Sequence, residues 1–178
     1  IEFYSKIIEC VSNCQIILYN FEKLSGYKFS APCVEALVKR YPQNIVGLKD
    51  SSYNLFENLK IDNFSMMPGS ETKLLKGLEL GCSGIITATC NVTSELSRKV
   101  YDDFQSGKNQ TVNQKLCDVR NEFEKYNLIS ALHTFFTKKN KFYRNVLPPL
   151  SLLNLDDQKK LEGNLEKLNF STKSLMAA

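Results

Sequence analysis

Four short apolar runs, each followed by a loop and a helical pattern, constrain the fold of this chain most. The runs are QIILYN at 15–20, NIVGLKD at 44–50, FSMMPG at 64–69 and GIIT at 84–87. Their apolar residues stand at consecutive positions, which is typical of strands buried on both faces. Single helices between such strands are the crossovers of a parallel sheet, because each helix covers one of its faces. The sequence therefore predicts a parallel α/β fold.

Helical spacing of apolar residues predicts the remaining elements. Helices are expected at 1–12 before the first run, at 30–41, 55–59 and 74–80 between the runs, and around 96–104 after the last run. From residue 108 the pattern changes to helices without strands, at 109–126, 128–138 and 155–169, with a loop at 145–150. We therefore expect two parts, a β/α part over residues 1–107 and a helical appendage over 108–178.

Composition excludes several classes of protein. With 178 residues, 43% of them hydrophobic, the chain is long enough for one globular core plus an appendage. The net charge of +4 is spread along the chain, and the densest basic stretch, KKNK at 138–141, is typical of a solvated helix end rather than a nucleic-acid site. No apolar stretch is long enough to cross a bilayer, and we expect no signal peptide. We expect neither nucleic acid nor membrane as a partner.

The cysteine pattern argues against a metal site. Six cysteines occur without a CxxC pair and without histidine at ligand spacing. They stand in apolar periodic segments, as buried free thiols do, which favours a reducing, cytoplasmic location. The single histidine, His133, lies beside Leu132 and Phe135 and is expected to be a packed helix residue.

Reactive residues stand where the predicted strands end. Tyr19, Lys49, Gly69 and Thr87 close the four runs, and the carboxyl ends of parallel strands meet at one rim. Lost hydration in an apolar wall destabilises the ammonium form of a lysine, so that the neutral amine is available to attack a carbonyl. A neighbouring tyrosine can relay protons. The pair predicts Schiff-base chemistry, with Ser51 as a partner for substrate hydroxyls, although a strand ending at the surface is the alternative for Lys49.

Several segments together resemble a known family. These segments are ILYNFEKLSG, IVGLKDSS, MMPGSETKLLKGLELGCSGIITATCNV and LPPL. In order and spacing they are similar to the dihydrodipicolinate synthase and N-acetylneuraminate lyase family of pyruvate-dependent aldolases, over nearly the whole chain. The resemblance implies a TIM (β/α)8 barrel, a homo-tetramer or dimer when full length, whose lysine forms an imine with pyruvate or another 2-keto acid. It implies neither a cofactor nor a metal.

The resemblance also assigns roles to individual residues. Lys49 matches the imine-forming lysine and Tyr19 the catalytic tyrosine. The expected substrate-binding residues are Ser51, Gly69, Glu71 and Ile86, the last through its backbone.

By the family pattern the chain contains only strands 5–8 of the barrel and the C-terminal helices. The loop that holds the keto acid carboxylate and a second tyrosine of the proton relay belong to the part that is absent. Four open strands would expose unpaired edges, so we expect a fragment or part of a longer protein rather than a self-sufficient enzyme.

One position bears on the substrate. In the synthase and in the sialic acid lyase an arginine stands two residues before the glycine of the loop after the tyrosine strand, and this chain has Leu24 there. Leucine cannot replace a bidentate carboxylate partner. The branch that acts on 2-keto-3-deoxy sugar acids also lacks the arginine. We therefore expect a lyase that cleaves such an acid to pyruvate and an aldehyde.

Two main alternatives stay open, besides other pyruvate-handling lyases and hydratases. The first is a 4-hydroxy-tetrahydrodipicolinate synthase, which condenses pyruvate with aspartate semialdehyde through the same imine. The second is a non-catalytic relative that binds keto acids or only assembles with other subunits. The aldehyde partner, the stereochemistry and any allosteric ligand are not determined by the sequence.

Overall fold

The computed structural model describes residues 1–11 and 13–171. It divides into two compact units, Ile1–Ile86 and a second unit that begins at Thr87. This division differs from the expected boundary between residues 107 and 108, which stays a prediction. Among the described residues, no helix combines the length and the apolar character needed to cross a bilayer.

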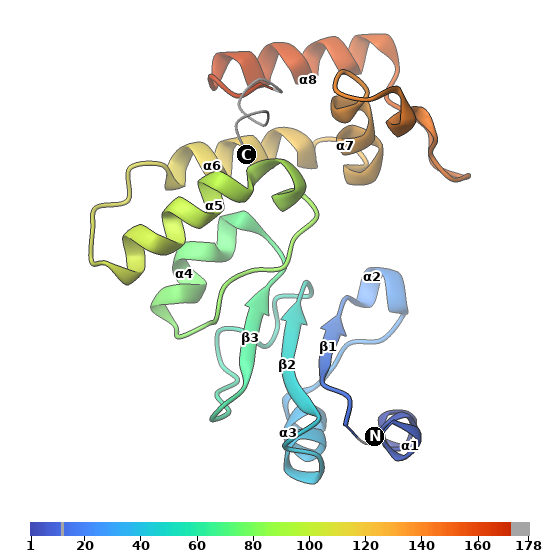
Figure 1. The fold of residues 1–178 in the computed structure, drawn as a ribbon, viewed down its shortest axis with the longest axis vertical. Helices are drawn as coiled ribbons and strands as arrows, with labels where there is room; N and C mark the ends of the chain where they lie inside the picture. Colours follow the sequence, from blue (N-terminus) through green and yellow to red (C-terminus); the bar gives the residue numbers. More distant parts are fainter. Residues whose placement is uncertain (12, 172–178) are drawn as a thin grey trace. The chain divides into compact units, whose positions relative to one another are not determined.

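The first unit is a three-stranded parallel sheet with helices (Figure 1). Its elements are α1 (Glu2–Cys10), β1 (Ile16–Asn20), α2 (Glu22–Ser25), α3 (Ala31–Arg40), β2 (Ile45–Asp50), β3 (Ser65–Pro68), the 3-10 helix η1 (Glu71–Lys73) and α4 (Leu74–Glu79). The strands lie in the order β1-β2-β3, with parallel pairing throughout. The first three predicted strands and the predicted α/β class are confirmed.

The two faces of this sheet differ because side chains alternate along a strand. Leu18, Leu48 and Met66 share one face and are buried against apolar side chains of α1 and α3. Helix α3 begins as predicted, with the Ser30 side chain accepting a hydrogen bond from the Cys33 backbone N–H and Pro32 in the first turn. On the opposite face Ile17 and Tyr19 remain exposed.

The fourth predicted strand, 84–87, is not formed. Residues 83–86 join β3 through the backbone hydrogen bonds from Ser83 N to Met66 O at 2.9 Å and from Ile86 N to Pro68 O at 3.2 Å. A regular parallel strand donates from every second residue, and these donors are three residues apart. Gly84 has a φ of +144°, a backbone conformation outside the β region. The irregular backbone at Gly84 therefore interrupts the ladder.

The helix expected at 55–59 is a single turn. Leu59 N donates to Leu55 O at 2.8 Å, and no helix is assigned to this segment. One turn is unfavourable alone, because several dihedral angles are fixed for one hydrogen bond. Here the Asp50 carboxylate stabilises it by accepting the backbone N–H groups of Leu55 and Phe56.

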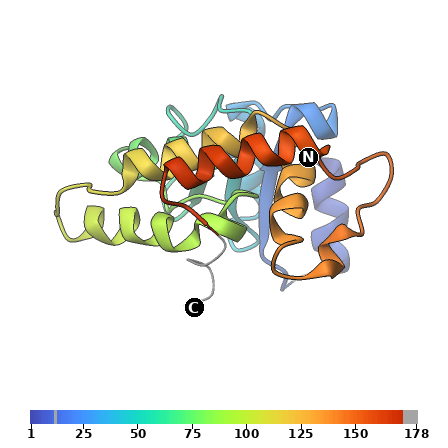
Figure 2. The same ribbon diagram turned by 90° about the horizontal axis from the view of Figure 1, so that it is seen from above.

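The second unit consists of helices. They are α5 (Cys90–Gln105), α6 (Asn113–Glu124), α7 (Leu128–Phe136), the 3-10 helix η2 (Lys141–Arg144) and α8 (Leu155–Lys167). The predicted helices are confirmed with ends that differ by a few residues, and η2 was not expected. Figure 2 shows α8 running along α6, and both contribute to one apolar core with α7. Phe123 is fully buried there, with its ring 5.4 Å from that of Phe135 in an edge-to-face contact.

Substitution of Gly47 by alanine is expected to destabilise the sheet. A Cβ at this position of β2 would lie 2.7 Å from the backbone oxygen of Ser65 on β3, so the strands would have to separate. We expect a loss of about 1–3 kcal/mol in the free energy of unfolding, measured by urea denaturation. The matched control is Gly163→Ala in α8, where a Cβ meets nothing within 4 Å. At Gly163, alanine should raise the free energy of unfolding by about 0.5–1 kcal/mol. Equal effects of the two substitutions would contradict the close approach of Gly47 to Ser65.

Truncation of Phe123 tests the core of the second unit. Phe123→Ala removes a fully buried ring and should cost about 3–5 kcal/mol of unfolding free energy. Phe142 in η2 is 73% exposed, and Phe142→Ala should change stability by less than about 0.5 kcal/mol. Thermal and urea unfolding of the two variants compare them directly. Similar losses would show that the assigned core is wrong.

Candidate active site

Tyr19 and Lys49 lie side by side at the carboxyl ends of β1 and β2. The two residues are partners in the register of the parallel pair, so their side chains leave the same face of the sheet. The Lys49 Nζ atom lies over the Tyr19 ring, 4.0 Å from its centroid. An aromatic face attracts a cationic amine and offers it fewer hydrogen-bond partners than water does.

The face around this pair is open. Met67 is the register partner of Lys49 on β3 and completes a row of three side chains with Tyr19. Lys49 is half-buried, and Tyr19 retains 45% of its exposure. The tyrosine ring covers one side of the lysine amine and also contacts Phe21 at a centroid distance of 5.8 Å. An apolar wall around the lysine stays a prediction.

A buried polar network lies on the opposite face, one residue further along each strand. Asn20 and Asp50 are also register partners, and both are fully buried. The Asn20 Nδ2 atom donates to Asp50 Oδ1 and to Asn54 Oδ1, each at 2.8 Å. The Asp50 carboxylate accepts three further hydrogen bonds from backbone N–H groups, those of Tyr53 and Leu55 at 2.9 Å and of Phe56 at 3.0 Å.

The same network fixes the loops around the strand ends. Asn20 Oδ1 accepts the Phe29 backbone N–H at 3.0 Å, and Asn54 Nδ2 donates to the Phe29 carbonyl at 3.0 Å. The backbone carbonyl of Asn20 accepts from Ser51 N and Ser52 N. This network was not predicted from the sequence. The only signal was two polar residues, Asn20 and Asp50, that directly follow apolar runs.

Ser51 and Gly69 are in direct contact. An added Cβ on Gly69 would lie 2.2 Å from the Ser51 Oγ atom, so only glycine fits beside this serine. The Gly69 backbone N–H donates to the Asp50 carbonyl at 3.0 Å, which ties the end of β3 to β2. The close approach expected of Gly69 is therefore made here by a side chain of the same protein, and the substrate role of both residues stays a prediction.

The other expected site residues lie further along the chain. Glu71 is fully buried at the start of η1. Ile86 is 37% exposed, and its backbone N–H donates to Pro68 O. Thr87 belongs to the second unit, where its hydroxyl accepts a hydrogen bond from Arg120 Nη1 at 2.8 Å. Roles for Glu71 and Ile86 in substrate binding stay predictions.

The Cys82 thiol adjoins the turn after β2. Its Sγ atom donates to the Phe56 carbonyl at 3.9 Å. Burial raises the pKa of this thiol, and the negative charge of Asp50 adds to the increase while Lys60 opposes it. A thiol with a raised pKa is a weak nucleophile near neutral pH, so Cys82 is a packing residue rather than a reactive one.

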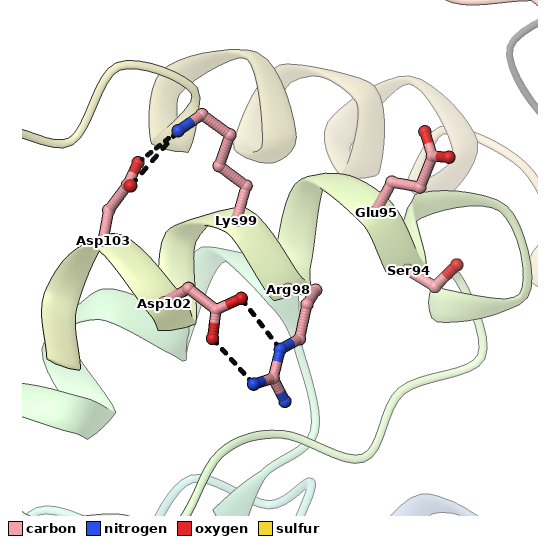
Figure 3. Close-up of a pocket in the computed structure, with 6 residues that line it drawn as sticks. All are labelled: Ser94, Glu95, Arg98, Lys99, Asp102 and Asp103. Atoms are coloured by element: carbon pink, nitrogen blue, oxygen red, sulfur yellow. Dashed lines mark hydrogen bonds and ion pairs between the residues drawn. The ribbon is translucent and has the colours of Figure 1, made fainter. Parts of the chain in front are cut away.

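The described residues contain no group of three histidine, cysteine, aspartate or glutamate side chains that could hold a metal ion. A depression of about 570 Å³ on the surface of α5 contains none of the predicted site residues (Figure 3). It is lined by Ser94, Glu95, Arg98, Lys99, Asp102 and Asp103. Its basic residues pair with carboxylates four positions later, Arg98 with Asp102 and Lys99 with Asp103, as helix-surface ion pairs do.

Known proteins resemble the chain over most of its length. It is 34% identical over 109 residues to a 4-hydroxy-tetrahydrodipicolinate synthase of Methanopyrus kandleri, a match covering 58% of this chain and 36% of that protein. It is 25% identical over 155 residues to a 2-dehydro-3-deoxy-D-gluconate/2-dehydro-3-deoxy-phosphogluconate aldolase of Picrophilus torridus. That match covers 83% of this chain and 57% of the aldolase. The chain thus spans only part of the length of these relatives.

Solved structures share its fold. Dihydrodipicolinate synthase from Agrobacterium tumefaciens superimposes with a TM-score of 0.78 at 21% identity, covering 94% of this chain and 59% of that one. YagE of Escherichia coli, solved in complex with pyruvate, superimposes with a TM-score of 0.75 at 21% identity. The superposition covers 95% of this chain and 60% of YagE. The three-stranded sheet is consistent with a part of the β/α barrel expected from the sequence. Because the family model matches residues 1–168, the chain belongs to the dihydrodipicolinate synthetase family.

Proposed function

We propose that this chain carries the imine-forming half of a lyase that cleaves a 2-keto-3-deoxy sugar acid to pyruvate and an aldehyde. The observation that carries the proposal is the position of the Lys49 amine, 4.0 Å from the centroid of the Tyr19 ring at the carboxyl ends of parallel strands. Active sites of β/α barrels lie at these ends. YagE, which shares the fold, has been solved with pyruvate bound.

In the proposed reaction the neutral Lys49 amine attacks the keto carbon of the substrate. The carbinolamine that results loses its hydroxyl group as water and becomes an iminium ion. Tyr19, whose ring lies next to the amine, delivers the proton that the departing hydroxyl needs in this proposal. These reaction steps need no metal or cofactor, because the iminium group itself accepts the electron pair of the bond that breaks.

Bond cleavage follows from the positive charge on the iminium. Tyr19, now a phenolate, removes the proton of the substrate hydroxyl next to the deoxy carbon. The carbon–carbon bond between the deoxy carbon and the hydroxyl-bearing carbon breaks, its electron pair enters the iminium as an enamine, and the aldehyde leaves. Protonation of the enamine carbon and addition of water then release pyruvate and the free lysine.

Leu24 favours a sugar acid over aspartate semialdehyde. It lies in α2, directly after the tyrosine strand, and its apolar side chain is 76% exposed. An aliphatic side chain provides no bidentate partner for a second carboxylate, which aspartate semialdehyde carries and a sugar aldehyde lacks. The 34% identity to a 4-hydroxy-tetrahydrodipicolinate synthase supports the synthase as the second candidate.

The proposal extends to the site that binds the aldehyde and to the oligomeric state of the active protein. We propose that the active protein is a homo-tetramer or dimer with a complete barrel, in the cytoplasm. An imine is hydrolysed by water, so the exposed side of Tyr19 and Lys49 must be covered during the reaction.

Trapping with borohydride tests the imine. Full-length protein incubated with pyruvate and sodium borohydride should gain one reduced pyruvate unit on Lys49, located by peptide mass spectrometry, because the reductant makes the imine permanent. Lys49→Arg keeps the charge but cannot form the imine and should stay unmodified. Tyr19→Phe should be modified about 100-fold more slowly, because it lacks the proton relay.

The outcome separates enzyme from non-catalytic relative. A wild-type protein with no lysine modified would exclude every imine mechanism and favour a binding or assembly protein. Equal labelling of the wild type and Lys49→Arg would locate the chemistry on another lysine.

A substrate panel tests the preference for sugar acids. We expect full-length protein to release pyruvate from a 2-keto-3-deoxy sugar acid with a higher kcat/KM than it shows for condensing pyruvate with aspartate semialdehyde, because Leu24 offers no carboxylate partner. Coupled detection of pyruvate release and of semialdehyde consumption measures both. A higher kcat/KM with the semialdehyde would assign the protein to the synthase instead.

A further inference from the structure

We propose that Asn20, Asp50 and Asn54 act as a positioning clamp that sets the separation of Tyr19 and Lys49. The inference rests on the proposed function, because the clamp acts through these two residues and does not touch the substrate. We call these three residues the clamp below.

The clamp is placed one residue from the reactive pair on both strands. Tyr19 precedes Asn20 and Lys49 precedes Asp50, and each of the two pairs is in register across β1 and β2. A hydrogen bond between the side chains of Asn20 and Asp50 therefore holds together the two backbones from which Tyr19 and Lys49 project. Because neighbouring residues point to opposite faces, the clamp controls the pair from behind the sheet.

The Asp50 carboxylate accepts its hydrogen bonds from uncharged donors. They are the amide of Asn20 and the backbone N–H groups of Tyr53, Leu55 and Phe56. Four donors aimed at two oxygens leave no place for a donor group on residue 50. Asp50→Asn would direct an NH2 group at existing N–H donors, so the strand ends would have to move apart.

Backbone strain after β2 adds to this dependence. Tyr53 has a φ of 55°, a left-handed conformation that is unfavourable for a residue with a bulky side chain. Its N–H is held by Asp50 Oδ1, and its ring contacts Phe56 at a centroid distance of 6.3 Å. When the carboxylate is lost, this turn is free to relax, and the end of β2 that carries Lys49 relaxes with it.

Third-strand contacts extend the clamp. The Asp50 carbonyl accepts Gly69 N, and the Asn20 carbonyl accepts Ser51 N, so the ends of all three strands are joined through clamp residues. Asn54 connects the turn to the loop before α3 through the Phe29 carbonyl. The clamp thus determines one geometry, the approach of the tyrosine to the lysine, rather than the stability of one loop.

A double-mutant cycle on imine formation tests the clamp. The rate of borohydride-trapped pyruvate addition to Lys49 is measured in full-length wild type, Asp50→Asn, Tyr19→Phe and the double variant. We expect Asp50→Asn to slow trapping about 10- to 100-fold in the wild-type background, because small displacements of reacting groups are costly. In the Tyr19→Phe background the same substitution should slow it less than about 3-fold, since the partner to be positioned is already disabled.

Controls separate positioning from general destabilisation. Asp62 is exposed, and Asp62→Asn should leave the trapping rate unchanged. Should Asp50→Asn fail to fold, Asn54→Ala removes only the bonds to Asn20 and to the Phe29 carbonyl and should show the same non-additivity with a smaller slowing.

Two results overturn the proposal in different ways. Equal slowing by Asp50→Asn in both backgrounds, with wild-type Lys49 modified normally, would reject the clamp and leave the proposed function intact. Absence of any adduct on wild-type Lys49 would reject the proposed function and, with it, the catalytic role of the clamp.

Discussion

The hydrogen bond between Asn20 and Asp50 is the interaction on which the candidate site depends. It joins two fully buried side chains at the ends of neighbouring parallel strands, where the backbone ladder stops. Removing one partner would leave the other buried without its bond, which costs more than the bond itself contributes. Register at this point is therefore strongly determined. Since Tyr19 and Lys49 immediately precede these residues, the register of the clamp is also the register of the proposed catalytic pair.

Alternation along the strands lets one sheet serve two purposes. The face with Leu18, Leu48 and Met66 is buried against helices and stabilises the unit through apolar contact. The other face leaves Tyr19 and Lys49 accessible to a small molecule. A reactive amine needs access, whereas a precise distance needs rigidity. Placing the two on opposite faces of the same strands meets both needs, because rigidity is transmitted through the backbone rather than through contacts in the site.

Local pattern was sufficient for much of this structure. Apolar runs predicted β1, β2 and β3, and helical spacing predicted the longer helices but not α2, η1 or η2. The convergence of parallel strand ends predicted that Tyr19 and Lys49 meet. The prediction failed for residues 84–87, which have the composition of a strand but do not pair with β3 as one. The backbone conformation of Gly84 interrupts the hydrogen-bond ladder there. The network around Asp50 was missed for a related reason. Asn54 and Phe29 are 25 residues apart, and nothing in their local sequence indicates that they meet.

The open face also limits what this part of the family fold can do alone. Among its large apolar side chains, Ile17 and Tyr19 remain substantially exposed, so water has access to the amine. Water that reaches an iminium intermediate hydrolyses it to the keto acid and the free amine, in competition with cleavage of the carbon–carbon bond. The solved relatives contain about two fifths of their length beyond the matched portion, since 59% and 60% of two of them are covered. For the proposed chemistry, the role of such a portion is therefore to exclude water from a pair of residues whose relative position is already set within residues 1–86.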